Sequence, residues 1–129
     1  MILYLTIITT ILFCVLDSIL IKNNIQIDHW IETFAHFAIV FLVGASYNST
    51  PIGLIYTLVS FFVVRAGVYD YLLNIFRRLP LNYTSKSTGS ILDKIEQKTG
   101  LGEVKIRLYL FIVFCIYFIA NLLFYDKLF

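Results

Sequence analysis

Residues 51–78, PIGLIYTLVSFFVVRAGVYDYLLNIFRR, decide the fold, because they are typical of one long membrane-spanning helix that carries a charge inside it. Thr50 and Pro51 fit a helix start, with a hydroxyl at the N-cap and proline at the first helical position. At ~1.5 Å per residue, a helix from Pro51 to Arg78 exceeds the ~30 Å hydrocarbon core, so its basic end should reach water. Arg65 lies within the apolar part, where a cation is costly and needs a partner.

The composition of the whole chain is that of a membrane protein. Of its 129 residues, 60% are hydrophobic and 14% are charged, whereas soluble domains carry roughly a quarter charged residues. The length accommodates about four spans of ~20 residues. We therefore predict one all-α membrane domain, residues 1–129, that is a bundle of four transmembrane helices at about 2–21, 30–47, 51–73 and 107–125, with a long third loop at about 77–106.

The basic residues indicate how the chain is oriented. Lys22 follows the first span and seven Lys or Arg lie within residues 77–107, whereas residues 48–50 contain none and the C-terminal end has only Lys127. By the positive-inside rule, the first and third loops are cytoplasmic, and both termini are outside. The basic loop is thus a topology signal, and we expect no nucleic-acid partner. The aromatic residues expected at the inner interface are Trp30, Tyr69, Tyr71 and Tyr109, and those expected at the outer one are Tyr4, Tyr47 and Tyr125.

The third loop contains a helix signal of its own. Ser90 and Asp93 fit a capping box, and Gly100 supplies a stop. Between them, residues 91–95 place three aliphatic side chains on one face. The pattern predicts a short helix at the inner membrane surface, although a loop helix packed on the bundle would give the same pattern.

Several ionisable residues of the predicted spans lie at similar depth, toward the basic side. They are Asp17, Glu32, His36, Arg65 and Asp70. We predict that they form an intramembrane polar cluster in which Asp17 or Glu32 neutralises Arg65. Because the opposite half of the bundle is nearly devoid of charge, the cluster should be a water-filled pocket open to one side. A charged pathway across the bilayer is disfavoured.

A metal site is an alternative interpretation of part of this cluster. His29, Glu32 and His36 are spaced i, i+3, i+7 and share a helix face, and two imidazoles with a carboxylate could bind zinc or iron. The two histidines are almost two turns apart, however, so Asp17 or Asp70 would have to help. The simpler interpretation has His29 at the interface and a carboxylate paired with Arg65, and on that interpretation we expect no cofactor.

A second polar stripe consists of Asp70, Asn74 and Arg77 (i, i+4, i+7), with Arg65 on a different face. Hydrogen bonds from this stripe could tie down the polar loop that follows. Alternatively, the basic residues could hold anionic phospholipid headgroups or simply anchor the topology. The residues assigned to loop anchoring or headgroup binding are Asn74, Arg77, Arg78, Asn82, Tyr83, Lys94 and Lys98.

This region also carries a resemblance. The pattern is Arg65-x4-Asp70-x3-Asn74-x3-Arg78-Leu79-Pro80-x-Asn82-Tyr83, followed by Ser87-Thr88 and Asp93-Lys94. It resembles a pattern in small uncharacterised polytopic membrane proteins of bacteriophages and Bacteroidota bacteria, over about 30 residues. Those proteins often have Arg-Gly-Leu-Pro where this chain has residues 77–80. The resemblance implies no activity, but it suggests that residues 70–83 are a device shared by the family. We expect the chain to lie in a bacterial inner (cytoplasmic) membrane.

The sequence leaves three functions open. The first is a small non-enzymatic membrane protein that binds anionic lipid or self-associates as a homo-oligomer, in a holin-like, phage-encoded form. The second is a membrane-embedded metal-dependent enzyme acting on a lipid-linked substrate, and the third is a transporter or channel subunit. The chain has no G-x-S-x-G, Walker or dinucleotide-binding motif, which argues against serine-hydrolase and nucleotide-driven chemistry.

Overall fold

The computed structural model describes residues 1–83, 98 and 102–128, and this part of the chain contains no strand. Its helices are α1 (Ile2–Lys22), α2 (His29–Tyr47), α3 (Pro51–Phe76) and α5 (Glu103–Leu128). All four are long and apolar enough to cross a membrane. The predicted all-α bundle with four spans is therefore confirmed, while the short helix predicted at residues 90–100 lies outside the described residues.

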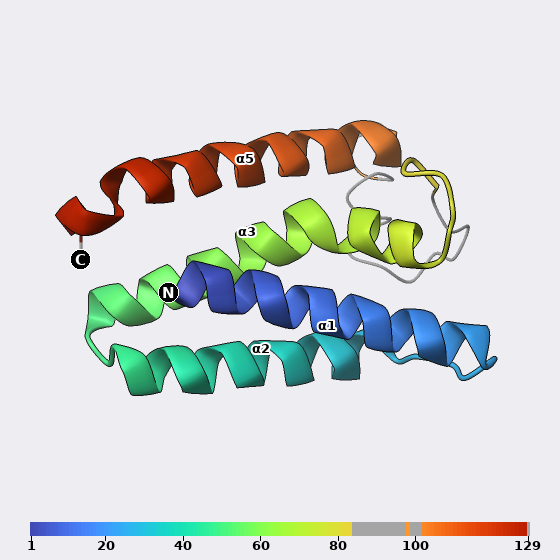
Figure 1. Cartoon of the computed structure of the whole chain (residues 1–129), viewed down its shortest axis with the longest axis horizontal. Coiled ribbons are helices and arrows are strands. Elements are labelled where there is room, and N and C mark those ends of the chain that lie inside the picture. The colour runs from blue at the N-terminus through green and yellow to red at the C-terminus, as the bar shows by residue number, and fades with distance from the viewer. Residues whose placement is uncertain (84–97, 99–101, 129) are drawn as a thin grey trace.

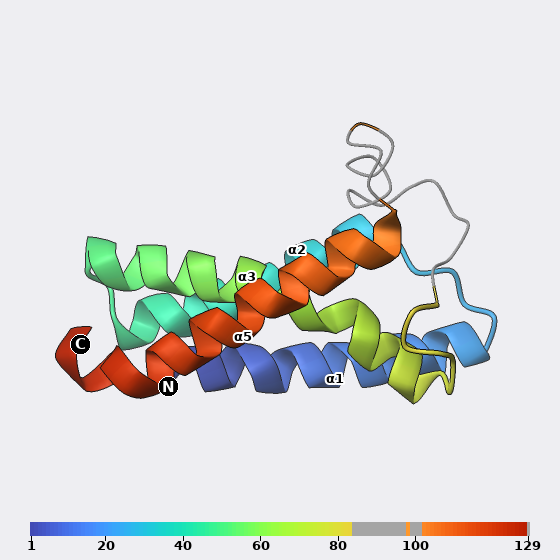
Figure 2. The ribbon, with the colours of Figure 1, turned by 90° about the horizontal axis from the view of Figure 1, so that it is seen from above.

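Successive helices run in opposite directions, so α1 and α3 are parallel to each other (Figure 1). The first three helices pack together, and α5 crosses the outside of α3 (Figure 2). Both termini and the α2–α3 connection lie toward one end of the bundle. We call the other end the basic end, because it carries Lys22, Arg77, Arg78 and Lys105.

The helix starts follow from local sequence. The Asp28 carboxylate caps α2 by accepting a hydrogen bond from the Trp30 amide at 2.9 Å. The Thr50 hydroxyl caps α3 by accepting from the Gly53 amide at 3.1 Å, with Pro51 at the first helical position. The start predicted from Thr50 and Pro51 is thus confirmed.

Two helix ends at the basic end share one geometry. The residue after the C-cap has a left-handed backbone, with φ of 58° at Asn24 and 57° at Arg78. After α3, the Leu79 amide donates to the Asn74 carbonyl at 2.9 Å, as in a Schellman motif. This turn ends α3 at Phe76, two residues short of the limit that its sequence allowed.

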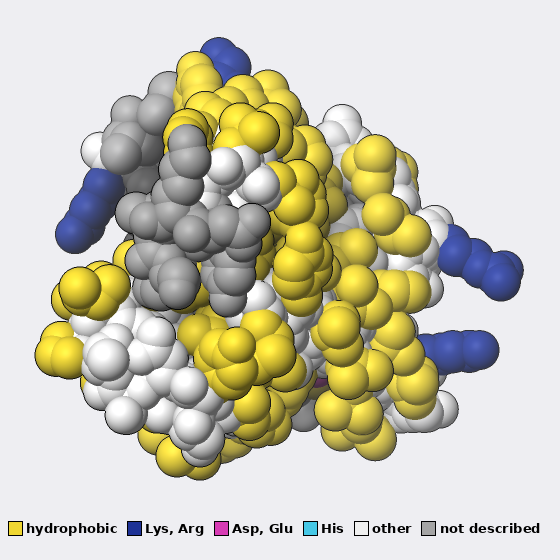
Figure 3. Space-filling model, turned by 60° about the vertical axis from the view of Figure 1, so that its left-hand side comes forward, with side chains coloured by type: hydrophobic (Ala, Val, Ile, Leu, Met, Phe, Trp, Pro, Cys, Tyr) yellow, Lys and Arg dark blue, Asp and Glu magenta, His cyan; other side chains and the backbone are white. Residues whose placement is uncertain are grey.

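The bundle buries many polar side chains and exposes large apolar ones. Buried threonine, serine and ionisable side chains face its axis, whereas large apolar side chains such as Leu12, Phe34 and Leu42 are exposed. Figure 3, in which the end opposite the basic end comes forward, shows hydrophobic side chains over much of this face, with Lys and Arg at its margins. Soluble proteins have the reverse arrangement. The outer faces of the spans therefore contact the lipid bilayer.

α5 approaches α3 closely at one glycine. A Cβ atom at Gly67 would lie 2.6 Å from the Phe114 Cβ and 3.0 Å from the Leu110 carbonyl oxygen. Small residues at such crossings let helix backbones approach each other in membranes. Glycine at this position therefore sets how closely α5 can dock.

Candidate functional site

The cation of α3 is paired with a carboxylate of α2. The Arg65 guanidinium donates to both carboxylate oxygens of Glu32, at 3.1 Å for Nη1–Oε1 and with a second bond from Nη2 to Oε2. Nη2 also donates to the Thr33 hydroxyl at 2.8 Å. The two ionic side chains are only 13% and 8% exposed. A two-pronged pair of this kind fixes orientation as well as charge.

His36 continues the network toward α1. Its Nδ1 lies 3.0 Å from Arg65 Nη1, and its Nε2 lies 3.0 Å from the Thr9 hydroxyl. Because a guanidinium can only donate, Nδ1 must accept, so the proton is on Nε2 and the ring is neutral. The imidazole also stacks on Phe13, with ring centroids 4.6 Å apart. His36 thus joins α1, α2 and α3 without adding charge.

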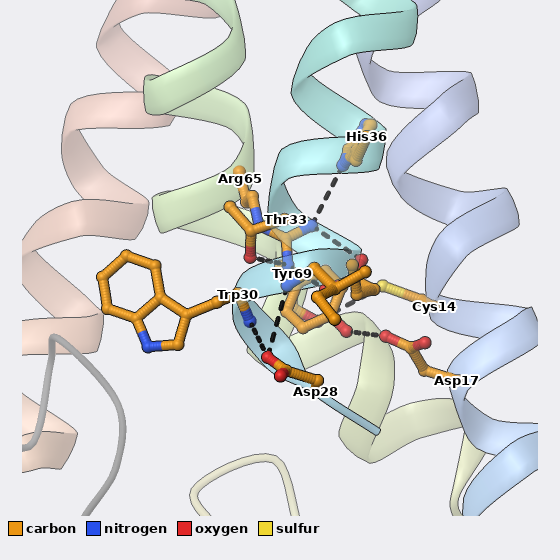
Figure 4. A network of polar contacts seen from close by, with 10 residues as sticks. Cys14, Asp17, Asp28, Trp30, Thr33, His36, Arg65 and Tyr69 are labelled. Carbon is orange, nitrogen blue, oxygen red and sulfur yellow. Dashed lines mark hydrogen bonds and ion pairs between the residues drawn. The ribbon is translucent and has the colours of Figure 1, made fainter. Parts of the chain in front are cut away.

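Tyr69 connects Arg65 to the remaining carboxylate. The guanidinium carbon of Arg65 lies 4.2 Å from the centroid of the Tyr69 ring, a cation–π contact. The Tyr69 hydroxyl donates to Asp17 Oδ2 on α1 (Figure 4). The sequence placed Tyr69 in the interfacial aromatic belt, and that prediction is wrong because the side chain is buried beneath Arg65. Trp30 and Tyr109, assigned to the same belt, are exposed.

We call this set the Arg65 cluster: Asp17, Glu32, His36, Arg65 and Tyr69. It brings together four of the five ionisable residues that the sequence placed in one cluster. The cluster is closed, however, since Asp17 is 1% and His36 0% exposed. The open, water-filled pocket that we expected is therefore not formed, because the polar groups bond to one another instead of to solvent.

Asp70 belongs to a different site. Its carboxylate lies 3.3 Å from Nε of Arg107 on α5. Arg107 Nη1 donates to the Tyr83 carbonyl at 2.8 Å, and the Asn74 amide donates to the same carbonyl at 3.0 Å. We call Asp70, Asn74, Tyr83 and Arg107 the Arg107 cluster. Asn74 thus ties down the chain after α3, one of the roles expected for it, whereas Arg107 was counted only as a topology charge.

The three residues of the metal-site alternative do not converge. Among the residues that the structure describes, no three His, Cys, Asp or Glu side chains are grouped so that they could hold a metal ion. His29 is exposed at the first position of α2, while Glu32 and His36 both bond to Arg65.

Neutral hydrogen bonds between α3 and α5 were missed by the sequence analysis. Ser60 and Tyr117 hydroxyls lie 2.7 Å apart, and the Tyr56 hydroxyl donates to Asn121. The signal that could have revealed them is a matching spacing. Tyr56 and Ser60 are four residues apart on α3, and Tyr117 and Asn121 are four residues apart on α5. These contacts fasten α5 in the half of the bundle that lacks charge.

The basic end presents accessible cations. Four of those that the structure describes are exposed: Lys22, Arg78, Lys98 and Lys105. Arg77 is half-buried, with its guanidinium carbon 5.9 Å from the centroid of the Tyr83 ring. A hollow of about 280 Å³ lies at the connection between α1 and α2, lined by Ile21, Asn24, Ile25, Gln26, Ile27 and His29. Lys94 lies outside the described residues, and Asn82 is exposed.

No protein-family model matches the chain, and searches of curated proteins and of solved structures likewise gave no match. Its function must therefore be argued from its own geometry. The four spans make it a small polytopic membrane protein, with one closed ionic cluster inside and free cations at one end.

Proposed function

We propose that this chain is a non-enzymatic integral membrane protein that binds anionic phospholipid headgroups at its basic end. The observation that supports this is which of its cations take part in ion pairs. Within the described part of the chain, the two ion pairs involve Arg65 and Arg107, and the exposed Lys22, Arg78 and Lys105 belong to neither. Each cation next to a membrane attracts anionic lipid by about 1 kcal/mol.

Other features of the basic end fit contact with headgroups. Trp30 and Tyr109 are exposed near it, and such rings prefer the membrane–water interface. The hollow at the α1–α2 connection is lined by isoleucines together with Asn24, Gln26 and His29. A lining that is partly apolar and partly polar suits the region where an acyl chain meets its headgroup.

The proposal includes an orientation and a setting. The excess of cations supports a cytoplasmic basic end with both termini outside, and the resemblance of residues 65–94 to phage and Bacteroidota proteins supports a bacterial inner membrane. Self-association, including a holin-like assembly, is the version of the proposal that has less support. Polar side chains of the described spans face inward, so the outer faces fit lipid better than a second copy.

The test measures thermal unfolding of the detergent-purified protein with added phosphatidylglycerol or phosphatidylcholine. We expect the anionic lipid to raise the melting temperature more than the zwitterionic one. The variant Lys22→Gln/Arg78→Gln/Lys105→Gln should lose this difference. A matched control, Lys127→Gln, alters a cation in the last turn of α5 at the opposite end and should keep it. Equal stabilisation of the triple variant by the anionic lipid would refute the proposal.

The two alternative functions have less support. An enzyme acting on a lipid-linked substrate needs reactive groups that the substrate can reach, yet Glu32 and His36 are buried and bonded to Arg65. A channel needs a polar path that continues between the ends, whereas the ionic groups of the described spans cluster on the side of the basic end. On either alternative, anionic lipid need not stabilise the protein more than zwitterionic lipid does.

A further inference from the structure

The Arg65 cluster contains more carboxylates than cations. The bidentate pair with Glu32 uses the charge of Arg65, and His36 is neutral because its Nδ1 accepts from that guanidinium. Tyr69 contributes a neutral hydroxyl to Asp17. Asp17 therefore has no ion-pair partner among the described residues, and a fully ionised cluster would hold a net charge of about −1 inside the membrane.

Asp17 is also poorly solvated. Its side chain is 1% exposed, and its Oδ1 atom is buried without a hydrogen-bond partner in the described structure. An ionised carboxylate can accept about four hydrogen bonds, whereas Asp17 accepts one, from Tyr69. A buried carboxylate in such surroundings is strongly disfavoured and takes up a proton instead.

We propose that Asp17 is a proton-binding site. A proton from water at the basic end adds to Oδ1, an O–H bond forms, and the carboxylate becomes a neutral carboxylic acid. Oδ2 continues to accept from Tyr69. The protonated cluster then contains one cation and one anion, Arg65 and Glu32, and is electrically neutral. This inference does not depend on lipid binding at the basic end.

The surroundings of Asp17 determine what its proton affects. The charged or titratable groups around it are Cys14 on α1, His29 and Glu32 on α2, and Arg65 and Tyr69 on α3. α5 packs mainly on α3 and meets α1 at Tyr4 and Phe118, far along α1 from Asp17. Without the proton, the Asp17 carboxylate would be a second anion near Arg65, on the other side of Tyr69. The proton therefore keeps Glu32 as the sole anionic partner of Arg65.

The direct test is infrared spectroscopy of the wild-type protein in lipid bilayers. We expect a C=O band of a protonated carboxylic acid at neutral pH, which shifts when aspartate is labelled with ¹³C. The band should vanish in Asp17→Asn. Absence of the band from the wild-type protein, or its failure to shift with aspartate labelling, would overturn the proposal without requiring any variant to fold.

Thermal unfolding as a function of pH provides a second test. The folded bundle holds a proton that a water-exposed Asp17 in the unfolded chain releases at neutral pH, so wild-type stability should fall as pH rises. Asp17→Asn mimics the protonated acid without having to take up a proton, so it should match wild type at low pH, melt at or above wild type at neutral pH, and lose this fall. The matched control Glu32→Gln leaves Arg65 unpaired and should lower the melting temperature by roughly 10 °C. Equal losses in the two variants would show that Asp17 is ionised.

Discussion

Two largely enclosed arginines of this bundle perform different structural tasks. Arg65 is held by side chains of α2 and by the Tyr69 ring, and its ionic partner is only 8% exposed. Arg107 joins α5 to Asp70, which is 27% exposed, and to a backbone carbonyl after α3. The first arginine therefore holds helices together, and the second fixes a loop at the rim.

The difference follows from the accessibility of the two carboxylates, because the arginine side chains themselves are similarly enclosed, at 13% and 10% exposed. Charges far from water interact strongly and are little screened by salt, whereas charges close to solvent are screened. Removing one partner of an enclosed pair leaves a buried charge, which costs far more than losing an accessible pair. The same residue type is thus essential to the fold in one cluster and of moderate value in the other.

The largest effect is expected from reversing the charge in the Arg65 cluster. Arg65→Glu places two carboxylates face to face and should destabilise the bundle by at least about 3–5 kcal/mol, more than Arg65→Ala. Adding Glu32→Lys should restore much of the stability, because it recreates the pair. Adding Asp17→Lys should rescue less, because Asp17 contacts Tyr69 instead of the guanidinium. Melting in detergent measures all four variants, and equal rescue by both lysines would contradict the assignment.

The docking of α5 can be disturbed without touching either arginine. Gly67→Ala puts a Cβ atom against Phe114 and the Leu110 carbonyl, and overpacking of this kind costs about 1–3 kcal/mol. Gly102→Ala is the matched control, because a Cβ atom there meets open space. Crosslinking of cysteines placed across α3 and α5 would report the change. A Gly67 variant that crosslinks as efficiently as the control would show that the crossing is loose.

The stability lost on mutating each arginine should depend on salt to a different extent. Arg107→Ala removes a partly accessible ion pair and the hydrogen bond to the Tyr83 carbonyl, so we expect a loss of about 1–2 kcal/mol. This loss should shrink as the salt concentration rises, because salt screens the Asp70 pair. The loss caused by Arg65→Ala should stay nearly constant. Melting curves at low and high salt test this, and a salt-sensitive Arg65 would mean that its cluster is open to water.

The smallest effect concerns the turn that leads from α3 into the Arg107 cluster. Arg78 has a φ of 57°, a conformation that costs most residues about 1–2 kcal/mol and glycine much less. Arg78→Gly should therefore stabilise the protein slightly, by roughly 0.5–1 kcal/mol. Asn24→Gly, at the equivalent position after α1, should change little because asparagine tolerates this backbone. A destabilised Arg78→Gly variant would show that the arginine side chain holds the turn.

Local signals in the sequence were sufficient to predict the four spans. Thr50 and Pro51 specify a helix start through their own chemistry, and the apolar runs specify four membrane-length helices. The need of Arg65 for a partner also followed from the cost of burying its charge. Whether that partner was Glu32 or Asp17 did not follow, because the rotation of each helix depends on packing between segments far apart in sequence.

The remainder of the site depends on such packing. Tyr69 lies near the end of a span, as interfacial tyrosines do, and nothing local shows that it faces inward. Arg107 belongs to a group of basic residues that we interpreted as a topology signal. Its pairing with Asp70 was therefore not predicted. Asp70 itself lies five residues after Arg65, on another face of α3, and this spacing explains why it leaves the Arg65 cluster.

The order of α2 and α3 along the chain bears on how the bundle enters the membrane during synthesis. An arginine alone in the bilayer centre costs about 2.5–3.5 kcal/mol on insertion scales. Glu32 and Arg65 stand almost equally far from the tight connection at residues 48–50. When the ribosome delivers α3, its counter-ion is already present on the preceding helix. The Glu32–Arg65 pair can therefore form within the α2–α3 hairpin as an electrically neutral pair, before α5 has been made.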